Sequence, residues 1–441
     1  MSLASSASGL LSQNEEYLRL AAIFGEERTV DAYLAFERAL AEVQSELGVI
    51  PSGAVAFIEA TCRLNALDLE ALNRDAARVG YPIVPLVEQL AERAGAPGQW
   101  IHYGATTQDV MDTAQALQMR EAGDIILQNL GQLESLLAEL VVAHRHTLMV
   151  GRSKLQHAVP ITFGFKAAVW LDQLIRRRYV LVNALDAASV VQFGGATGTL
   201  ASLPEQGLAV RAGLACKLGL REPDISWHVS RDRMADVVYA LASLAAALGK
   251  IAVDISHMMS TEVGELCEPA AEGRGSSSTM PQKRNPVLCE AIIEAARDIR
   301  GCPARVLDAM LQDHERAIGH GYGERRALVA AMTETAGAVS LAVELVQGLE
   351  VKPGAMAHNV NLSKGLAYAE AAMLHLAKQV GRIEAHHVLR DVCQRVVDEE
   401  GLTLKQALRE AGIHMPDNIF RPASLESALA GMVDRVLSRV T

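Results

Sequence analysis

Apolar residues recur at helical spacing in five long runs of the chain, at 112–147, 162–191, 232–263, 286–313 and 324–349. The first run contains no proline and only two widely spaced glycines, Gly123 and Gly131. At 1.5 Å per residue, that run predicts a rod of roughly 50 Å. Helices of this length exceed the usual globular helix, and they pack as a bundle or against other subunits. The pattern therefore predicts an all-α fold with a central bundle of five long helices.

Shorter helical patterns flank the five runs on both sides. Before them, breaks at Gly80-Tyr81-Pro82 and Gly95-Ala96-Pro97-Gly98 separate short apolar repeats. After Pro353 the repeats shorten again, with turn signals at Gly381 and Gly401. We expect three domains, a small helical N-terminal domain at 1–111, the bundle at 112–352 and a small helical C-terminal domain at 353–441.

The composition agrees with close packing of helices. Hydrophobic residues make up 50% of the 441 positions but aromatic residues only 4%, so the apolar surface is mainly aliphatic. The net charge of −11 and the lack of a long basic run argue against a nucleic-acid partner. In such a chain an anionic substrate needs a locally positive pocket.

The cysteines and the N-terminus bear on compartment and metal binding. Six cysteines are scattered without a Cys-x-x-Cys pair, which indicates neither a disulfide framework nor a thiolate metal site. Met1 to Ser12 lacks the basic and apolar regions of a signal peptide, and no apolar run approaches a membrane span. We expect a cytoplasmic protein without a cofactor, a bound metal or a membrane partner.

The loop at 273–286 differs most from its surroundings. It combines Gly273 and Gly275 with four successive hydroxyl residues and, just before Pro286, with Lys283, Arg284 and Asn285. Because proline is favoured in the first helical turn, the loop is predicted to deliver amides and cations to a helix N-terminus, where anions bind. A flexible linker is the alternative. Two prolines, a methionine and a Lys-x-Asn within seven residues make a poor tether.

This loop resembles the signature Gly-Ser-x-x-Met-x-x-Lys-x-Asn of the fumarase/aspartase superfamily. Ser277, Met280, Lys283 and Asn285 fall on its fixed positions, and Ser276 replaces the glycine. The resemblance implies that Ser277 is the acid or base that moves a proton on the carbon next to a carboxylate. A serine alkoxide needs amide donors, a nearby cation and exclusion of water. Lys283, Asn285 and loop amides are suited to stabilise the carbanion intermediate.

A second candidate segment, Thr106-Thr107-Gln108-Asp109, immediately precedes the first long run. Its local interpretation is a helix cap, in which Thr106, Thr107 or Asp109 satisfies free amides. The superfamily carries hydroxyl residues matching Thr106 and Thr107 that bind substrate carboxylate. The two roles are compatible, because both use donors and the helix dipole. Thr106, Thr107 and Gln108 are therefore predicted to bind substrate.

A third segment, 151–162, lacks a residue that the resemblance leads us to expect. Most of the superfamily has a histidine here, following a threonine, that protonates the leaving group; this chain has Ser153-Lys154. A positioned acid is worth roughly 10² to 10⁴ in rate. Either Lys154 or His157 takes over as the acid, or the reaction needs none.

One branch of the superfamily, the bacterial 3-carboxy-cis,cis-muconate cycloisomerases, lacks that histidine. The chain resembles this branch in several stretches, at 104–109, 155–158, 192–196, 227–233 and 314–316. In lactonisation the nucleophile is the substrate's own ionised carboxylate, so no acid is needed to activate a leaving amine. In the stretch at 227–233, His228 is either a site residue or a packed histidine. Arg316 and Arg325 match arginines that hold the nucleotide phosphate in adenylosuccinate lyases, whereas Gly321 stands where a phosphate-binding serine would be.

The resemblance implies a small polycarboxylate substrate and a homotetramer whose active sites are shared between subunits. Our first hypothesis is a carboxymuconate cycloisomerase-like enzyme with Ser277 as the acid or base. Our second is a C–N lyase that releases fumarate from an amino-dicarboxylate, with Lys154 or His157 assisting. A third is an inactive helical scaffold, against which the intact Ser277, Met280, Lys283 and Asn285 argue.

Overall fold

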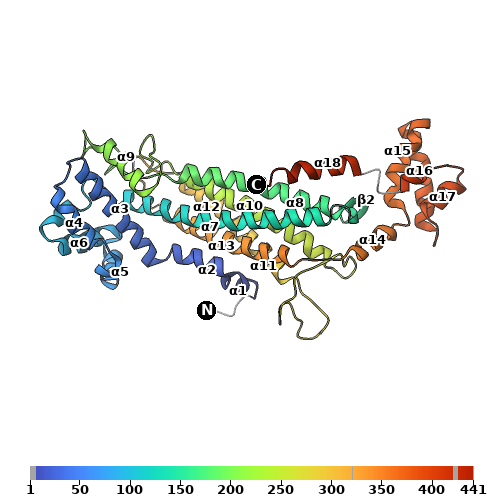
Figure 1. The fold of residues 1–441 in the computed structure, drawn as a ribbon, viewed down its shortest axis with the longest axis horizontal. Coiled ribbons are helices and arrows are strands. Elements are labelled where there is room, and N and C mark those ends of the chain that lie inside the picture. Colours follow the sequence, from blue (N-terminus) through green and yellow to red (C-terminus); the bar gives the residue numbers. More distant parts are fainter. Residues whose placement is uncertain (1–5, 320, 421–425, 441) are drawn as a thin grey trace. The chain divides into compact units, whose positions relative to one another are not determined.

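The computed structural model describes residues 6–319, 321–420 and 426–440 (Figure 1). Helices dominate it, as the all-α prediction requires. The helices that precede the first long one are short, except for the third. They are α1 (Ser6–Ser12), α2 (Glu15–Ile23), α3 (Glu26–Glu46), α4 (Ser52–Thr61), α5 (Leu69–Val79) and α6 (Ile83–Ala94), with 3₁₀ turns η1 (Leu64–Ala66) and η2 (Ala96–Trp100).

The predicted long runs form long helices, with one exception. These helices are α7 (Thr107–Ala143), α8 (Phe163–Ala188), α10 (Asp232–Met258) and α13 (Gly321–Gln347). The prediction of one helix over 286–313 is wrong, because the structure has α11 (Val287–Ile299) and α12 (Cys302–Ala309) in its place. Pro303 lies in the first turn of α12, and its ring and missing N–H prevent a helix from continuing through this point.

The remaining elements are short. The helices are α9 (Gly207–Leu218), α14 (Pro353–Leu362), α15 (Ala369–Val380), α16 (Arg382–Asp398), α17 (Leu404–Glu410) and α18 (Glu426–Leu437), with 3₁₀ turns η3 (Leu366–Tyr368) and η4 (Asp417–Phe420). Two antiparallel pairs of strands, β1 (Leu148–Ser153) with β2 (Gln156–Thr162) and β3 (Leu266–Cys267) with β4 (Glu350–Val351), were not predicted.

The chain divides into two compact units. Unit 1 comprises 1–129, 177–246 and 294–340, and unit 2 comprises 130–176, 247–293 and 341–441. The boundaries fall within long helices, so α7, α8, α10, α11 and α13 each contribute residues to both units. The division into domains 1–111, 112–352 and 353–441 stays a prediction.

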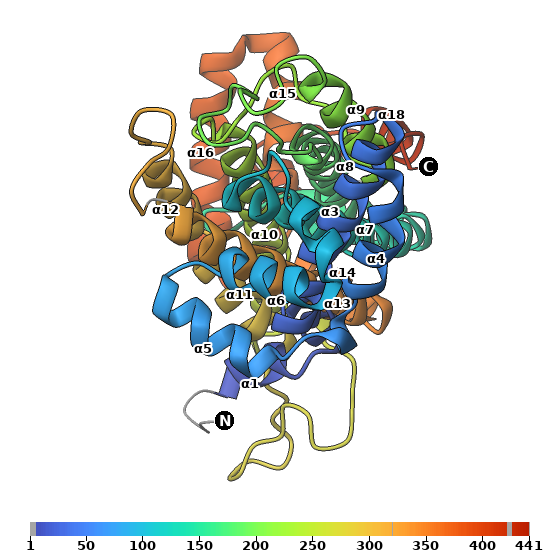
Figure 2. The same ribbon diagram turned by 90° about the vertical axis from the view of Figure 1, so that its left-hand side faces the viewer.

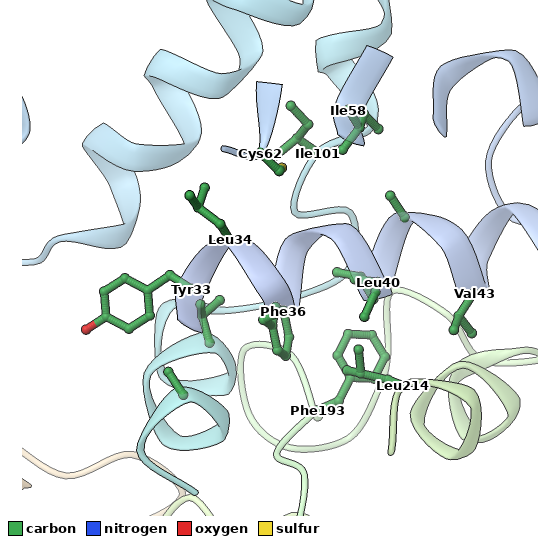
Figure 3. Close-up of a cluster of buried hydrophobic side chains, with 14 of the residues drawn as sticks. Tyr33, Leu34, Phe36, Leu40, Val43, Ile58, Cys62, Ile101, Phe193 and Leu214 are labelled. Atoms are coloured by element: carbon green, nitrogen blue, oxygen red, sulfur yellow. The ribbon is translucent and has the colours of Figure 1, made fainter. Parts of the chain in front are cut away.

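In unit 1, one face of α3 forms the centre of a hydrophobic core (Figure 3). Tyr33, Phe36, Leu40 and Val43 recur at spacings of three and four and are buried, which is the pattern of an amphipathic helix. Gly213 of α9 lies so close that a Cβ there would come within 2.6 Å of Val43. Glycine at 213 therefore permits the close approach of α9 to α3.

In unit 2, a separate core joins the short C-terminal helices. Ala372 of α15, Leu389 and Val396 of α16, and Leu404 and Leu408 of α17 are buried together. Burying such a leucine or valine contributes roughly 1.5–3 kcal/mol relative to its exposure. These helices thus pack on one another through their own apolar faces.

Among the residues that the structure describes, three helices are long and apolar enough to cross a membrane by length and composition, contrary to the sequence prediction. They are α7, α10 and residues 323–347 of α13, and 39%, 61% and 67% of their most apolar windows are buried inside the protein. A bundle helix that packs on several sides is apolar on most of its circumference. The alanines that allow close packing also raise the mean hydropathy of these helices, so their apolar stretches are longer than the sequence prediction assumed.

Candidate active site

A pocket of about 410 Å³ lies in unit 1, at the start of α7. Segments from before α10 and from between α12 and α13 complete its wall. The predicted substrate residues Thr106, Thr107, Gln108, His228 and Arg316 all line this pocket. The structure therefore brings together three of the stretches that carry the resemblance, 104–109, 227–233 and 314–316, although they are far apart in the chain.

The other predicted site residues lie in unit 2. Lys154 and His157 belong to the β1–β2 hairpin, and Ser277, Met280, Lys283 and Asn285 belong to the loop before α11. None of these residues is among those that line the pocket of unit 1.

The first turn of α7 is capped by Asp109. Its Oδ2 accepts the Thr106 N–H at 3.0 Å, and the Asp109 N–H donates to the Thr106 carbonyl at 3.0 Å. This is one of the capping arrangements that the sequence predicts. The threonine side chains are half-buried at the pocket, where a helix N-terminus favours negative charge.

The buried carboxylate of Asp109 also binds two other segments. Oδ1 accepts the Gly194 N–H at 3.1 Å and lies 2.8 Å from His228 Nε2, while Oδ2 accepts the Gly195 N–H at 3.0 Å. His228 is buried too, and its carbonyl accepts an N–H of Gln108 at 2.9 Å. Bonding to a carboxylate assigns the proton to Nε2 of the imidazole.

The glycines at this turn leave room for His228. A Cβ on Gly194 would lie 2.4 Å from Ser226 Oγ and 3.0 Å from His228 Cε1. Gly198 has a φ of +82°, and a Cβ there would lie 3.5 Å from His228 Nδ1. A side chain at either glycine would crowd or strain the turn around the imidazole.

Arg231 lines the pocket, but its guanidinium is fully occupied by ion pairs with other residues of the protein. It pairs with Asp112 at 2.9 and 3.1 Å and with Glu324 at 2.8 Å, and its guanidinium lies 5.0 Å from the Trp227 ring centre. Burial lowers the pKa of Arg231, but the two carboxylates outweigh burial and hold that pKa above its ordinary value. Its partners are therefore one carboxylate of α7 and one of α13, and Arg231 links these helices to the start of α10 through buried charge.

Two other arginines of the pocket have only neutral partners among the described residues. Arg316 Nη1 donates to Thr106 Oγ1 and to the Ala196 carbonyl, both at 3.3 Å. Arg325 Nη2 donates to Gln118 Oε1 at 3.3 Å and to Thr29 Oγ1 at 3.4 Å. Their positive charge is available to a substrate anion, as the sequence analysis required of a pocket in an acidic chain.

The loop around Ser277 extends away from the helices of unit 2 (Figures 1 and 2, yellow). Ser277 Oγ accepts the Met280 N–H at 3.0 Å and the Thr279 N–H at 3.3 Å. Two amides aimed at one hydroxyl oxygen are the donors that a serine alkoxide needs. Met280 is 43% exposed and Lys283 is exposed, so unit 2 alone does not exclude water from this loop.

The neck of the loop is closed by backbone contacts. Ser276 and Arg284 form an antiparallel bridge, and the Asn285 N–H donates to the Gly275 carbonyl at 2.9 Å. A Cβ on Gly275, whose φ is +66°, would lie 2.6 Å from the Asn285 carbonyl oxygen. Ser276, which replaces the signature glycine, donates to the Gly273 carbonyl at 2.9 Å. The substitution therefore leaves a closed neck.

The N-terminus of α11 does not offer an anion site, contrary to the prediction for this loop. The buried carboxylate of Glu268 accepts the N–H groups of Leu288 and Cys289 at 3.1 and 2.7 Å. Arg284 donates to the Glu268 carbonyl at 2.6 Å and to Glu350 at 3.1 Å. A carboxylate of the chain already accepts two amides of this helix end, and Arg284 is anchored beside it.

The segment from which the superfamily's acid is missing forms the β1–β2 hairpin. Lys154 and Leu155 occupy its turn with φ values of 51° and 66°, and Lys154 is exposed. His157 pairs across the hairpin with Arg152, which in turn binds the buried Glu265 at 2.8 Å. Partial burial and then the Arg152 charge lower the pKa of His157, so its neutral form dominates at neutral pH.

Several residues that organise the site were not identified from the sequence. The sequence indicates only a capping role for Asp109, and nothing in it marks Asp112, Glu324 or Glu268 as partners of site residues. The described residues contain no group of three or more histidines, cysteines and carboxylates arranged to hold a metal ion.

This helical chain, with its serine loop and its arginine-containing pocket, is similar in sequence and structure to known lyases. A family model described as lyase matches residues 4–301. The chain is 42% identical to 3-carboxy-cis,cis-muconate cycloisomerase of Pseudomonas aeruginosa, over 86% of this chain and 83% of that one. It is 38% identical to trans-aconitate decarboxylase 1 of Mycosarcoma maydis, over 99% and 90%.

A solved structure supports the same conclusion. The 3-carboxy-cis,cis-muconate lactonizing enzyme of Pseudomonas putida matches with a TM-score of 0.89 at 37% identity, over 96% of this chain and 97% of that one. The chain belongs to the fumarase/aspartase superfamily, and it is a lyase or cycloisomerase of that superfamily. The resemblance of its sequence motifs is thereby confirmed.

Proposed function

We propose that the chain catalyses the lactonisation of 3-carboxy-cis,cis-muconate. The relatives from Pseudomonas aeruginosa and Pseudomonas putida that carry this activity in their names support the substrate. The β1–β2 hairpin carries the argument from the structure. Ser153, the last residue of β1, and Lys154, in the turn, stand where a leaving-group acid is expected, and partial burial and then the Arg152 charge lower the pKa of the nearby His157. Lactonisation is the superfamily reaction that does not need this acid.

In the proposed reaction, one carboxylate oxygen of the substrate adds to a carbon of its own diene. A C–O bond forms, a C=C π bond breaks, and the electron pair moves to the carbon next to a carboxylate. Ser277 delivers a proton to that carbon, so the product is an isomer of the substrate. The Thr279 and Met280 amides stabilise the alkoxide that remains, until water protonates it. Lys283 and Asn285 stabilise the charge on the carboxylate of the intermediate.

The pocket of unit 1 supplies carboxylate binding in this proposal. Thr106 and Thr107 lie at the N-terminus of α7, and Arg316 has no carboxylate partner among the described residues. Together with Gln108 and His228, they hold substrate carboxylates by hydrogen bonds and charge.

The proposal includes a homotetramer with active sites shared between subunits. Two observations support it. The Ser277 loop is exposed in unit 2, and α8 and α10 carry exposed aromatic residues such as Tyr179 and Tyr239. Burial of such residues against other copies is a common use of exposed apolar surface on long helices. A cytoplasmic location is also part of the proposal.

An ultraviolet assay with 3-carboxy-cis,cis-muconate tests this function. The wild type should remove the muconate chromophore, and Ser277→Ala should lower the rate by roughly 10² or more, because the proton donor is lost. Ser278→Ala, which changes the exposed neighbouring hydroxyl, is the matched control and should keep the wild-type rate.

The same protein is then given adenylosuccinate, argininosuccinate and trans-aconitate. Fumarate released from an amine donor, with muconate untouched, would identify the C–N lyase alternative. Carbon dioxide from trans-aconitate would identify a decarboxylase. If Ser277→Ala retained every detected activity, Ser277 would not be the acid or base.

A further inference from the structure

One buried carboxylate, that of Asp109, organises much of the pocket, and the proposed function gives it no role. Asp109 is fully buried, and its two oxygens accept hydrogen bonds from three separate segments of unit 1. These segments are the turn before α7, the glycine turn at 194–195 and the residues before α10. Buried carboxylates are costly unless donors satisfy them, so these four donors are jointly required.

The two oxygens of Asp109 serve different partners. Oδ2 accepts the Thr106 N–H and the Gly195 N–H, both at 3.0 Å. Arg316 Nη1 donates to Thr106 Oγ1 and to the carbonyl of Ala196, the residue after Gly195. The same two turns that Oδ2 joins therefore hold the guanidinium of Arg316 in place.

Oδ1 positions the imidazole. It lies 2.8 Å from His228 Nε2 and accepts the Gly194 N–H at 3.1 Å. The His228 carbonyl accepts an N–H of Gln108, so the first turn of α7 binds this histidine through both side chain and backbone. The predicted substrate residues Thr106, Gln108, His228 and Arg316 are thus all one or two hydrogen bonds from one carboxylate.

We propose that Asp109 is the positioning residue of the carboxylate-binding pocket, and that it sets substrate affinity by fixing Thr106, His228 and Arg316 relative to one another. This inference rests on the proposed function only in assuming that the pocket binds carboxylates. Asp109 is buried behind the residues it holds, and it acts on the substrate through them. A purely structural carboxylate would affect stability and leave the affinity of the folded protein unchanged.

Calorimetric binding of tricarballylate, a saturated tricarboxylate that cannot react, tests the inference. Asp109→Ala should weaken binding roughly 10- to 100-fold. This is the loss of affinity expected when one or two charged hydrogen bonds to the ligand are no longer held in position. Asp109→Asn should recover part of this loss. Its amide oxygen can still accept the Thr106 and Gly195 N–H groups, while its NH₂ faces His228, which can present an unprotonated nitrogen. Asp124→Asn, an exposed position on the same helix, is the control and should bind as the wild type does.

In turnover assays, the Asp109 variants should raise KM more than they lower kcat. Folded Asp109→Ala protein that binds tricarballylate with wild-type affinity would overturn the inference, and so would a wild type that does not bind it. A wild type that binds tricarballylate but leaves muconate unchanged would refute the proposed function alone.

If Asp109→Ala does not fold, tricarballylate binding by Asp109→Asn decides, and deuterium exchange of the wild type tests the hydrogen bonds on which the inference rests. The amides of Thr106, Gly194 and Gly195 should exchange slowly without ligand, although they lie in turns, because each donates to a buried carboxylate. Exchange at the rate of open loops would contradict the proposal.

Discussion

Replacing Arg231 by methionine should destabilise unit 1 strongly. The guanidinium is 4% exposed and donates to both carboxylate oxygens of Asp112 and of Glu324. Methionine fills similar volume but leaves two buried carboxylates without their cation. Removing one partner of a buried ion pair costs about 3–5 kcal/mol, because the remaining charge is stranded.

Urea denaturation of the wild type and Arg231→Met, followed by circular dichroism, measures this loss. Arg233→Met is the matched control, since Arg233 is half-buried two residues away and has no ion pair among the described residues. Its free energy of unfolding should change by less than about 1 kcal/mol. Adding Glu324→Gln to Arg231→Met should recover part of the loss, because it removes one stranded charge.

A variant as stable as the wild type would refute the view that Arg231 serves as a buried counter-ion. Equal losses of stability in Arg231→Met and Arg233→Met would refute it as well.

Two further perturbations test the neck of the Ser277 loop and the half-buried carboxyl of Glu334. Gly275→Ala should reduce activity without unfolding the protein, because the added Cβ would lie 2.6 Å from the Asn285 carbonyl oxygen. Gly273→Ala is the control, since Gly273 has a similar φ but a Cβ there would meet no atom within 4 Å. Comparing the two variants separates the clash from backbone strain. Burial and then the Asp298 charge raise the pKa of Glu334 from 4.5 to about 7. Because the folded state binds the proton more tightly, wild-type stability should fall as pH rises from 4.5 to about 7, and Glu334→Gln should remove that fall in denaturation midpoint.

The long helices could be predicted because their signal is local. Apolar residues at helical spacing predicted α7, α8, α10 and α13, with ends that differ from the structure by a few residues. The break between α11 and α12 also has a local signal, Pro303. The apolar pattern continues on both sides of this proline, and the prediction of one helix followed that pattern.

The site could be predicted only in part, because its residues meet across the chain. The motif resemblance identified Thr106, His228 and Arg316, which the fold brings to one pocket. The role of Asp109 in positioning these residues could not be predicted from the motifs. Asp109 and His228 are 119 positions apart, and no periodicity links them.

The failed anion-site prediction for α11 has a similar cause. Pro286 and the loop cations correctly indicated a helix start. The carboxylate that fills it, Glu268, lies 20 positions before Leu288 and is brought there by the fold. The sequence could therefore locate the helix end but could not show that it was already satisfied.

Deuterium incorporation tests whether Ser277 delivers a proton to the carbon next to a carboxylate. The wild type is incubated with 3-carboxy-cis,cis-muconate in D₂O, and the product is analysed by proton NMR. If Ser277 delivers the proton, the wild type should form a lactone with one deuterium at that carbon, and Ser277→Ala should form it roughly 10² times more slowly or not at all. A lactone without deuterium, or equally fast formation of the deuterated lactone by Ser277→Ala, would contradict proton delivery by Ser277.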